Sequence, residues 1–239
     1  MSQALSLGVI TVDPLAGYRL LSATKDDAIE AEDHGKALNE GEILAVWRAA
    51  DGLGSFGHLV HMGLLTGLRR SELAALRWDW IDLEARRITI PGECMKNGRE
   101  RARPITTGIA RLLEIVPNRG ACLVFPSERR LGGATRLSGW SQLVARLRRD
   151  SSVDVSLHDL RRTYRSAMAD LGVREEIAEA MIAHQPSDLV ARYNRAELWA
   201  QRRAAAESFD ALLSALVSRN DGKGAGNVVA LGSVKKVAR

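Results

Sequence analysis

Six side chains of types that take part in phosphate chemistry lie in short polar segments along the chain. Two arginines can each bind two non-bridging phosphate oxygens, and their fixed charge stabilises a pentacoordinate phosphorus. A histidine exchanges a proton near neutral pH, and a lysine can protonate a departing oxygen. A tyrosine hydroxyl becomes a nucleophile when cations surround it. The six residues are Arg69, Lys96, His158, Arg161, His184 and Tyr193.

Four of these residues, taken alone, have an ordinary structural explanation. His158 and Arg161 are three positions apart, so on a helix they share a face and can form surface ion pairs with nearby acids. Arg69 follows a glycine-containing turn, where a surface arginine is common. His184, near the end of a predicted helix, interacts favourably with the helix dipole. The chemical interpretation therefore depends on the six residues together.

The candidate nucleophile is one of only three tyrosines in the chain. Tyr193 lies in the basic segment "ARYNR", which lacks the apolar neighbours that a core tyrosine needs. Tyr164 has Leu160, Ala167 and Met168 around it at helical spacing, which predicts that it packs in the core. Tyr18 is remote from the other candidates, and Tyr193 is therefore the predicted nucleophile.

Lys96 stands out because arginine is the usual basic residue of this chain. Of the 34 basic residues only six are lysines, and Lys96 is the only lysine between Lys36 and Lys223. A GC-rich genome is a sufficient explanation for the excess of arginine, but it does not explain the one position that remains a lysine.

The apolar spacing predicts a mainly helical α+β fold, a helical bundle with one small three-stranded antiparallel sheet. Asn39 is the expected N-cap of the first helix, "EGEILAVWRAAD", and the chain turns at Gly67 into a short helix. The segments "WDWIDL", "RRITI" and "RARPIT" alternate like strands and are separated by polar turns. Further helices are expected over residues 56–65, 107–116, 140–150, 158–171, 174–183, 188–194 and 197–218.

We divide the chain into three predicted parts. Residues 1–38 have little periodicity and are expected to be a linker or the remnant of a preceding domain. Residues 39–219 form the expected catalytic domain. Residues 220–239 are glycine-rich and basic and are expected to form a flexible tail.

Composition narrows the class of protein. With 46% hydrophobic and 26% charged residues the chain resembles a soluble globular protein, and its net charge of +5 favours a polyanionic partner. Apolar runs of membrane-spanning length and a signal-peptide pattern are both missing from it, so we expect a cytoplasmic protein. Cys94 and Cys122 lack metal-ligand spacing, and His58 with His61 lacks a third ligand, so no metal site is expected.

The order and spacing of the chemical motifs resemble the catalytic domain of the tyrosine recombinases, the phage and genomic-island integrases. The segments that carry the resemblance are "TGLRRSEL", "MKNGRERARPI", "LHDLRRT", the interval from His184 to Tyr193, "RWDWIDLEARRITIP" and "RYNRAE". Members of this family cleave and rejoin DNA strands through a 3′-phosphotyrosyl intermediate, without metal or ATP. The resemblance implies that Arg69 and Arg161 clamp the scissile phosphate, and that Tyr193 attacks it.

The same resemblance implies roles for the remaining residues. Lys96 would be the general acid, His158 an acid/base and His184 a phosphate donor, while Glu72 would orient arginine or histidine side chains. No cofactor is implied. The implied partner is double-stranded DNA at attachment sites, bound by a homotetrameric synapse in which helix 197–218 contacts a neighbouring copy. Expected DNA-binding residues are Arg99, Arg101, Arg146, Arg148, Arg149 and Arg162.

Two departures from the family pattern leave alternatives open. Ala183 stands where the family usually has glycine, and residues 1–38 resemble only the end of the N-terminal clamp domain, so we expect a truncated integrase. A DNA-binding relic without catalytic activity and a type IB topoisomerase are the alternative functions. Relaxation of plasmid that lacks an attachment site would identify the topoisomerase, and absence of a covalent adduct would identify the relic.

Overall fold

A computed structural model describes residues 35–94, 100–118, 122–127, 135–182 and 195–220, which all belong to one compact unit that begins at Gly35. Four predicted site residues, Lys96, Arg99, His184 and Tyr193, and the helix expected over residues 188–194 lie outside these ranges. None of the helices within them is long and apolar enough to cross a membrane.

The first two described helices pack against each other. Helix α3 (Glu40–Asp51) begins at Asn39, whose side chain accepts a hydrogen bond from the Glu42 N–H at 3.0 Å, while the Glu42 carboxylate accepts one from the Asn39 N–H at 3.0 Å. This capping box confirms the predicted helix start. Helix α4 (Gly54–Thr66) is buried along most of its length and packs against α3 and, later in the chain, α8.

The predicted sheet is present and has the order β1-β2-β3, with both pairs antiparallel. Its strands are β1 (Ile81–Asp82), β2 (Arg87–Ile90) and β3 (Arg101–Pro104). The first strand is shorter than its sequence pattern indicates, because Trp78–Trp80 forms a 3₁₀ turn, η1. A second 3₁₀ turn, η2 (Gly92–Cys94), follows β2. Strand β3 pairs Arg101 with Ile90 and Arg103 with Ile88.

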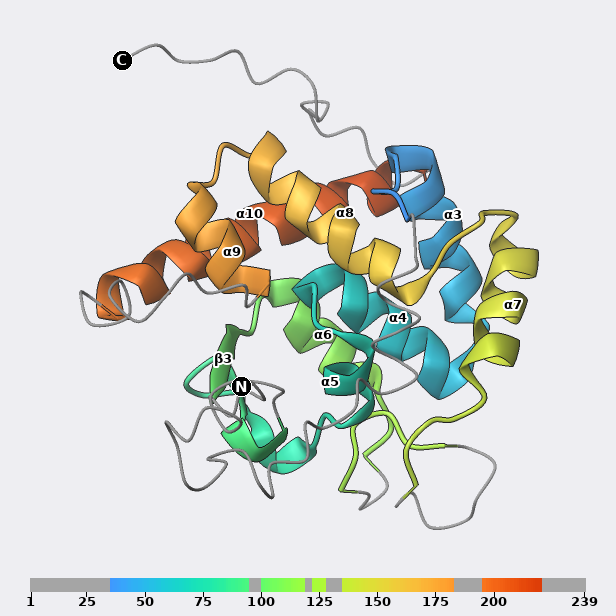
Figure 1. The fold of residues 1–239 in the computed structure, drawn as a ribbon, viewed down its shortest axis with the longest axis horizontal. Coiled ribbons are helices and arrows are strands. Elements are labelled where there is room, and N and C mark those ends of the chain that lie inside the picture. The colour runs from blue at the N-terminus through green and yellow to red at the C-terminus, as the bar shows by residue number, and fades with distance from the viewer. Residues whose placement is uncertain (1–34, 95–99, 119–121, 128–134, 183–194, 221–239) are drawn as a thin grey trace, which may run out of the picture. The chain divides into compact units, whose positions relative to one another are not determined.

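The remaining helices surround α4 and the sheet. Figure 1 shows α4, α5 and α6 in the middle of the view, α3 and α7 at one side, and α9 with β3 at the other. Each of these helices agrees with a predicted segment to within a few residues. Their bounds are α5 (Arg70–Ala74), α6 (Thr107–Ile115), α7 (Trp140–Ser151), α8 (Leu157–Asp170), α9 (Glu175–Ile182) and α10 (Arg195–Asn220).

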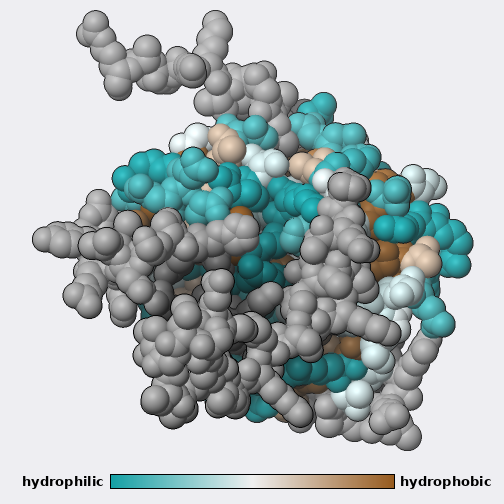
Figure 2. All heavy atoms as spheres, in the orientation of Figure 1, coloured by the Kyte–Doolittle hydropathy of each residue, from teal (hydrophilic) through white to brown (hydrophobic). Residues whose placement is uncertain are grey.

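Tyr164 is a core residue, as its apolar neighbours predict. It is 1% exposed, and its ring meets Phe209 of α10 edge-on with 5.0 Å between the ring centroids. Burial raises the pKa of its hydroxyl, although the nearby charges of Arg103 and Arg202 oppose the shift. Tyr164 is therefore a neutral packing residue. On the face shown in Figure 2, the described surface is mainly hydrophilic.

The apolar stripe of α10 packs inside its own chain. Ala206, Phe209 and Leu213 are buried in the core, and α10 contacts α3, α4, α6, α8, α9 and β3. The hypothesis that this stripe docks on a neighbouring copy is therefore not supported by the structure. The reason is physical: helices from the same chain already cover the apolar residues that such a contact would use.

Candidate active site

The site begins at the turn between α4 and α5, where Gly67 allows a sharp change of direction. Gly67 has a positive φ of 62°, a conformation that residues with a Cβ rarely adopt. A Cβ at this position would lie 2.6 Å from the Tyr164 ring. Glycine is therefore required both by the backbone conformation and by the space, and it places Arg69 at the start of α5.

Glu72 holds Arg69 in place through both its backbone and its side chain. The Arg69 N–H donates to Glu72 Oε2 at 3.0 Å, and Arg69 Nη1 donates to Glu72 Oε1 at 3.3 Å. Glu72 is buried, whereas the side chain of Arg69 is one quarter exposed. The carboxylate thus fixes both the backbone and the guanidinium of Arg69, while part of the side chain faces solvent. An arginine that binds a ligand needs both a fixed position and this exposure.

Arg101 is bound to the same carboxylate. Its Nη1 donates to Glu72 Oε1 at 2.9 Å, and Arg101 is 8% exposed. Burial alone opposes ionisation of Glu72, but the charges of Arg101 and Arg103 and the bond from the Arg69 N–H outweigh it and lower its pKa. Arg101 is one of the residues predicted to bind DNA. The structure instead places its guanidinium inside the protein, because β3 carries alternate side chains to the covered face of the sheet.

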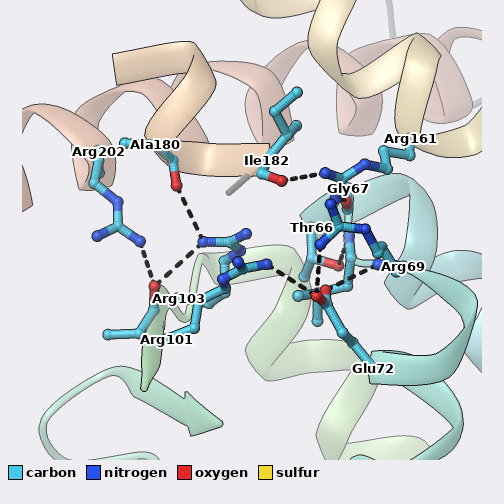
Figure 3. A network of polar contacts seen from close by, with 12 residues as sticks. Thr66, Gly67, Arg69, Glu72, Arg101, Arg103, Arg161, Ala180, Ile182 and Arg202 are labelled. Atoms are coloured by element: carbon cyan, nitrogen blue, oxygen red, sulfur yellow. Dashed lines mark hydrogen bonds and ion pairs between the residues drawn. The ribbon is translucent and has the colours of Figure 1, made fainter. Parts of the chain in front are cut away.

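Arg161 connects the same turn to the end of α9. Its Nη1 donates to the Gly67 carbonyl oxygen at 2.7 Å, and its Nη2 donates to the Ile182 carbonyl oxygen (Figure 3). The residue is 4% exposed. These two bonds, both to backbone carbonyl oxygens, fix the orientation of the guanidinium. Arg69 and Arg161 are thus fixed at one turn from two distant parts of the sequence.

His158 lies one turn before Arg161 on α8 and is half-buried. Ser156 caps this helix by accepting from the Asp159 N–H at 3.2 Å. Asp159 also binds Arg162 Nη1 at 3.0 Å, so Arg162, a predicted DNA-binding residue, is held beside the start of α8. The helix start therefore fixes the positions of both His158 and Arg162.

The three arginines predicted on α7 lie on its exposed side. Arg146 and Arg149 both pair with Asp150, at 3.6 Å and 2.9 Å, and Arg148 pairs with Asp154 at 3.2 Å. Two arginines therefore share one carboxylate, and this surface of α7 has an excess of positive charge.

Sequence analysis missed two arginines near the site, the buried Arg103 of β3 and the half-buried Arg202 of α10. Arg103 is 1% exposed and lies on the same face of the strand as Arg101. The alternation in "RARP" is the signal that could have identified this pair, since residues two apart on a strand point the same way. Arg202 carries no comparable signal, because one arginine on a long helix is usually exposed.

His58 and His61 lie on α4, and the sequence predicts no metal site there because a third ligand is missing. The His61 ring stacks on Trp47 with 4.0 Å between the centroids, and its Nε2 lies 2.9 Å from the Trp47 carbonyl oxygen. Burial lowers the pKa of His61, so the ring is neutral near pH 7. No group of three histidine, cysteine, aspartate or glutamate residues that could hold a metal occurs within the described ranges.

Comparison with known proteins now identifies the family. Residues 56–198 match the model of the phage integrase family, and this match covers more than half of the chain. The chain belongs to the phage integrase family. Among curated relatives, the prophage integrase IntZ of Escherichia coli K12 is 28% identical over 206 residues, which cover 83% of this chain and 50% of IntZ. The chain thus spans about half the length of this relative.

Solved integrase structures share the fold. The lambda integrase catalytic core has a TM-score of 0.50 and 19% identity, and the match covers 63% of this chain and 96% of that one. A lambda integrase dimer bound to a COC′ core site has a TM-score of 0.51 and 17% identity, over 95% of this chain and 58% of that one. At these identities the likeness confirms the predicted fold: a helical integrase domain with a small antiparallel sheet.

Proposed function

We propose that this chain carries the catalytic domain of a site-specific DNA recombinase, which cleaves and rejoins DNA strands through a 3′-phosphotyrosyl intermediate. Membership of the phage integrase family supports the proposal. The observation that carries it is the geometry of Arg69 and Arg161, which are both fixed at the turn after α4, one by a carboxylate and the other by two carbonyl oxygens. Two arginines fixed close together in this way are suited to binding one phosphate.

In the proposed cleavage step, the hydroxyl oxygen of Tyr193 attacks the scissile phosphorus. A bond forms between phosphorus and the tyrosine oxygen while the bond between phosphorus and the 5′ oxygen breaks. His158 accepts the tyrosine proton, and Lys96 gives a proton to the departing 5′ oxygen. The products are a 3′-phosphotyrosyl strand and a free 5′-hydroxyl strand.

The arginines stabilise the extra negative charge of the pentacoordinate transition state. Arg69 and Arg161 are already in place before DNA binds, so little reorganisation is needed during the reaction. His184 donates a hydrogen bond to the same phosphate. Glu72 acts as a positioning residue, since it binds Arg69 at both the backbone and the guanidinium.

Rejoining is the reverse reaction with the 5′-hydroxyl of another strand as the nucleophile. One phosphodiester bond is lost and one is formed, so the covalent intermediate conserves the bond energy. The proposed reaction therefore needs neither ATP nor a metal ion.

The proposed substrate is double-stranded DNA at an attachment site, bound by two or four copies of the chain. The lambda integrase structure, a dimer bound to a core site, supports this assembly by fold. Exposed arginines on α7, Arg146, Arg148 and Arg149, and Arg162 beside the start of α8 are the proposed contacts to DNA phosphates, together with Arg99.

The test is a covalent trapping experiment. The purified protein is incubated with a nicked DNA duplex from its own integration junction, so that cleavage releases a short fragment and prevents rejoining. We expect a DNA-linked protein band on a denaturing gel. Tyr193→Phe should abolish the band and Tyr164→Phe should leave it, because Tyr164 is buried in the core.

Two results would contradict the proposal. A band that persists in Tyr193→Phe would assign the nucleophile to another residue. No band from wild-type protein that binds the duplex would identify a DNA-binding relic.

A further inference from the structure

A buried arginine, Arg103, and a half-buried one, Arg202, lie between β3, α9 and α10, next to the Glu72 network but not part of it (Figure 3). Arg103 is 1% exposed, and its Nη1 makes two long hydrogen bonds, 3.4 Å to the Ala102 carbonyl oxygen and 3.5 Å to the Ala180 carbonyl oxygen. Arg202 donates from Nη2 to the same Ala102 oxygen. Two guanidinium groups therefore meet at one neutral acceptor.

The Nε and Nη2 atoms of Arg103 are buried and have no hydrogen-bond partner among the residues that the structure describes. The Nε atom of Arg202 is likewise buried and has no hydrogen-bond partner among these residues. Nε and Nη2 form one edge of the guanidinium, the edge that binds two oxygens side by side. Arg77 of the same chain shows this use, since its Nε and Nη2 bind the two carboxylate oxygens of Asp79 at 2.8 and 2.9 Å. Arg103 presents the same edge to the protein interior without such a partner.

Arg202 is held in a fixed position at the Ala102 carbonyl oxygen, to which Arg103 Nη1 also donates. Its guanidinium lies 5.2 Å from the centroid of the Trp199 ring, and Arg87 lies 4.3 Å from the same centroid. The aromatic ring attracts both cations but carries no charge to neutralise them. The position of Arg202 is therefore determined by Trp199 and by the Ala102 carbonyl oxygen, not by a carboxylate.

Positive charge exceeds negative charge in this region. Within the described ranges, Arg103 and Arg202 form no ion pair, and the nearby carboxylate of Glu72 already binds Arg69 and Arg101. Burial, together with the charges of Arg202 and Arg101, holds the pKa of Arg103 well below its ordinary value. Tyr164 is neutral because burial raises its pKa, so it does not supply the missing negative charge. Buried charges are normally paired, and this pair lacks an anion.

We infer that Arg103 and Arg202 form a binding site for one tetrahedral oxyanion, such as phosphate, separate from the Arg69 and Arg161 pair. The unpaired edge of Arg103 would bind two oxygens, and the unpaired Nε of Arg202 would bind a third. The oxyanion has two sources, free phosphate in solution or a phosphate of bound DNA. This inference does not depend on the proposed recombinase activity.

The experiment measures the thermal unfolding midpoint of the full chain in increasing inorganic phosphate, with sodium chloride adjusted to hold the ionic strength constant. For the wild type we expect a rise of about 3–6 °C for each tenfold increase in phosphate above its dissociation constant. A second series uses a short mixed-sequence DNA duplex in place of phosphate.

Arg103→Met should abolish the dependence on phosphate, and it should fold at least as stably as the wild type in chloride, because it removes a buried unpaired charge. Arg202→Met should weaken the dependence. Arg203→Met is the matched control, since Arg203 is the next residue of α10 and is exposed. It should respond to phosphate as the wild type does.

The two series distinguish the sources of the oxyanion. Stabilisation by phosphate that requires Arg103 supports a site for free oxyanions, and stabilisation by DNA alone that requires Arg103 supports the same site with DNA as the source. The inference is overturned if neither ligand stabilises the wild type, or if Arg103→Met responds as the wild type does. A negative trapping experiment with a positive phosphate series would refute the recombinase proposal alone.

Discussion

At the scale of single residues, Glu72 balances more positive charge than any other carboxylate of the described site. It binds Arg69 and Arg101, and its pKa is lowered by the neighbouring charges of Arg101 and Arg103. We expect Glu72→Gln to lower the free energy of unfolding by about 3–5 kcal/mol, since it leaves the buried Arg101 and the partly exposed Arg69 without their anion. Chemical denaturation at neutral pH measures this loss. Glu84→Gln, at an exposed position, is the control and should have little effect.

The ionisation of Glu72 also predicts a dependence on pH. Its pKa is lower in the folded protein than in the unfolded chain, so its contribution is complete above the unfolded value of about 4.3 and is lost as the pH falls through the folded value. The difference in unfolding free energy between wild type and Glu72→Gln should therefore be constant above about pH 5 and should shrink in more acidic solution. Denaturation curves across this range test the sign. A difference that grows on acidification would contradict the assignment.

Substitution of Arg161 tests whether cleavage depends on the geometry of the guanidinium at the turn after α4 or on its positive charge alone. It donates to two carbonyl oxygens, Gly67 and Ile182, and a lysine has one nitrogen and cannot span both. We expect Arg161→Lys to slow formation of the covalent adduct by about 100-fold or more, with the fold retained. Arg165→Lys is the matched control on the same helix, because Arg165 pairs with Glu179 away from the turn. Single-turnover cleavage of the nicked duplex measures both, and equal rates for the two variants would refute the clamp role.

At the scale of elements, the sequence predicts where helices and strands form better than it predicts which other elements pack against them. The cap at Asn39, the turn at Gly67 and the three strands are local features, and each is present. The burial of Arg101 and Arg103 was not foreseen. Their alternation on β3 indicates a shared face, but only α9 and α10, distant in sequence, make that face an interior one. The stripe of α10 shows the same limit, since amphipathicity does not identify the partner of a helix.

At the turn that joins α4 to α5, we expect one added methyl group to lower the stability of the fold. Gly67→Ala would place a Cβ 2.6 Å from the Tyr164 ring at a φ of 62°. We expect a loss of about 2–4 kcal/mol in unfolding free energy from backbone strain and overpacking together. Gly172→Ala separates the two causes, because Gly172 has a φ of 69° and nothing within 4 Å of the added Cβ. It should lose only about 1–2 kcal/mol, and an equal loss in both variants would show that crowding against Tyr164 is unimportant.

At the scale of the whole molecule, a net charge of +5 explains attraction to a polyanion but not where it binds. The chemistry proposed at the turn after α4 needs a surface beside it that holds the DNA backbone. Helix α7 offers such a surface, because Arg146 and Arg149 share the single carboxylate of Asp150. Binding to phosphates releases counterions, so the affinity should fall steeply with salt.

The decisive measurement is the slope of log affinity against log salt concentration for a duplex that carries the attachment site. Neutralising Arg146, Arg148 and Arg149 to glutamine should reduce the slope by up to about 2.7, since each phosphate contact contributes about 0.9. Arg111→Gln is the control for loss of charge alone, because Arg111 lines a pocket with Asp51 and Asp210, whose carboxylates repel DNA. An unchanged slope in the triple variant would exclude α7 from the interface. DNA would then have to be held mainly by Arg162 and by residues closer to the scissile phosphate.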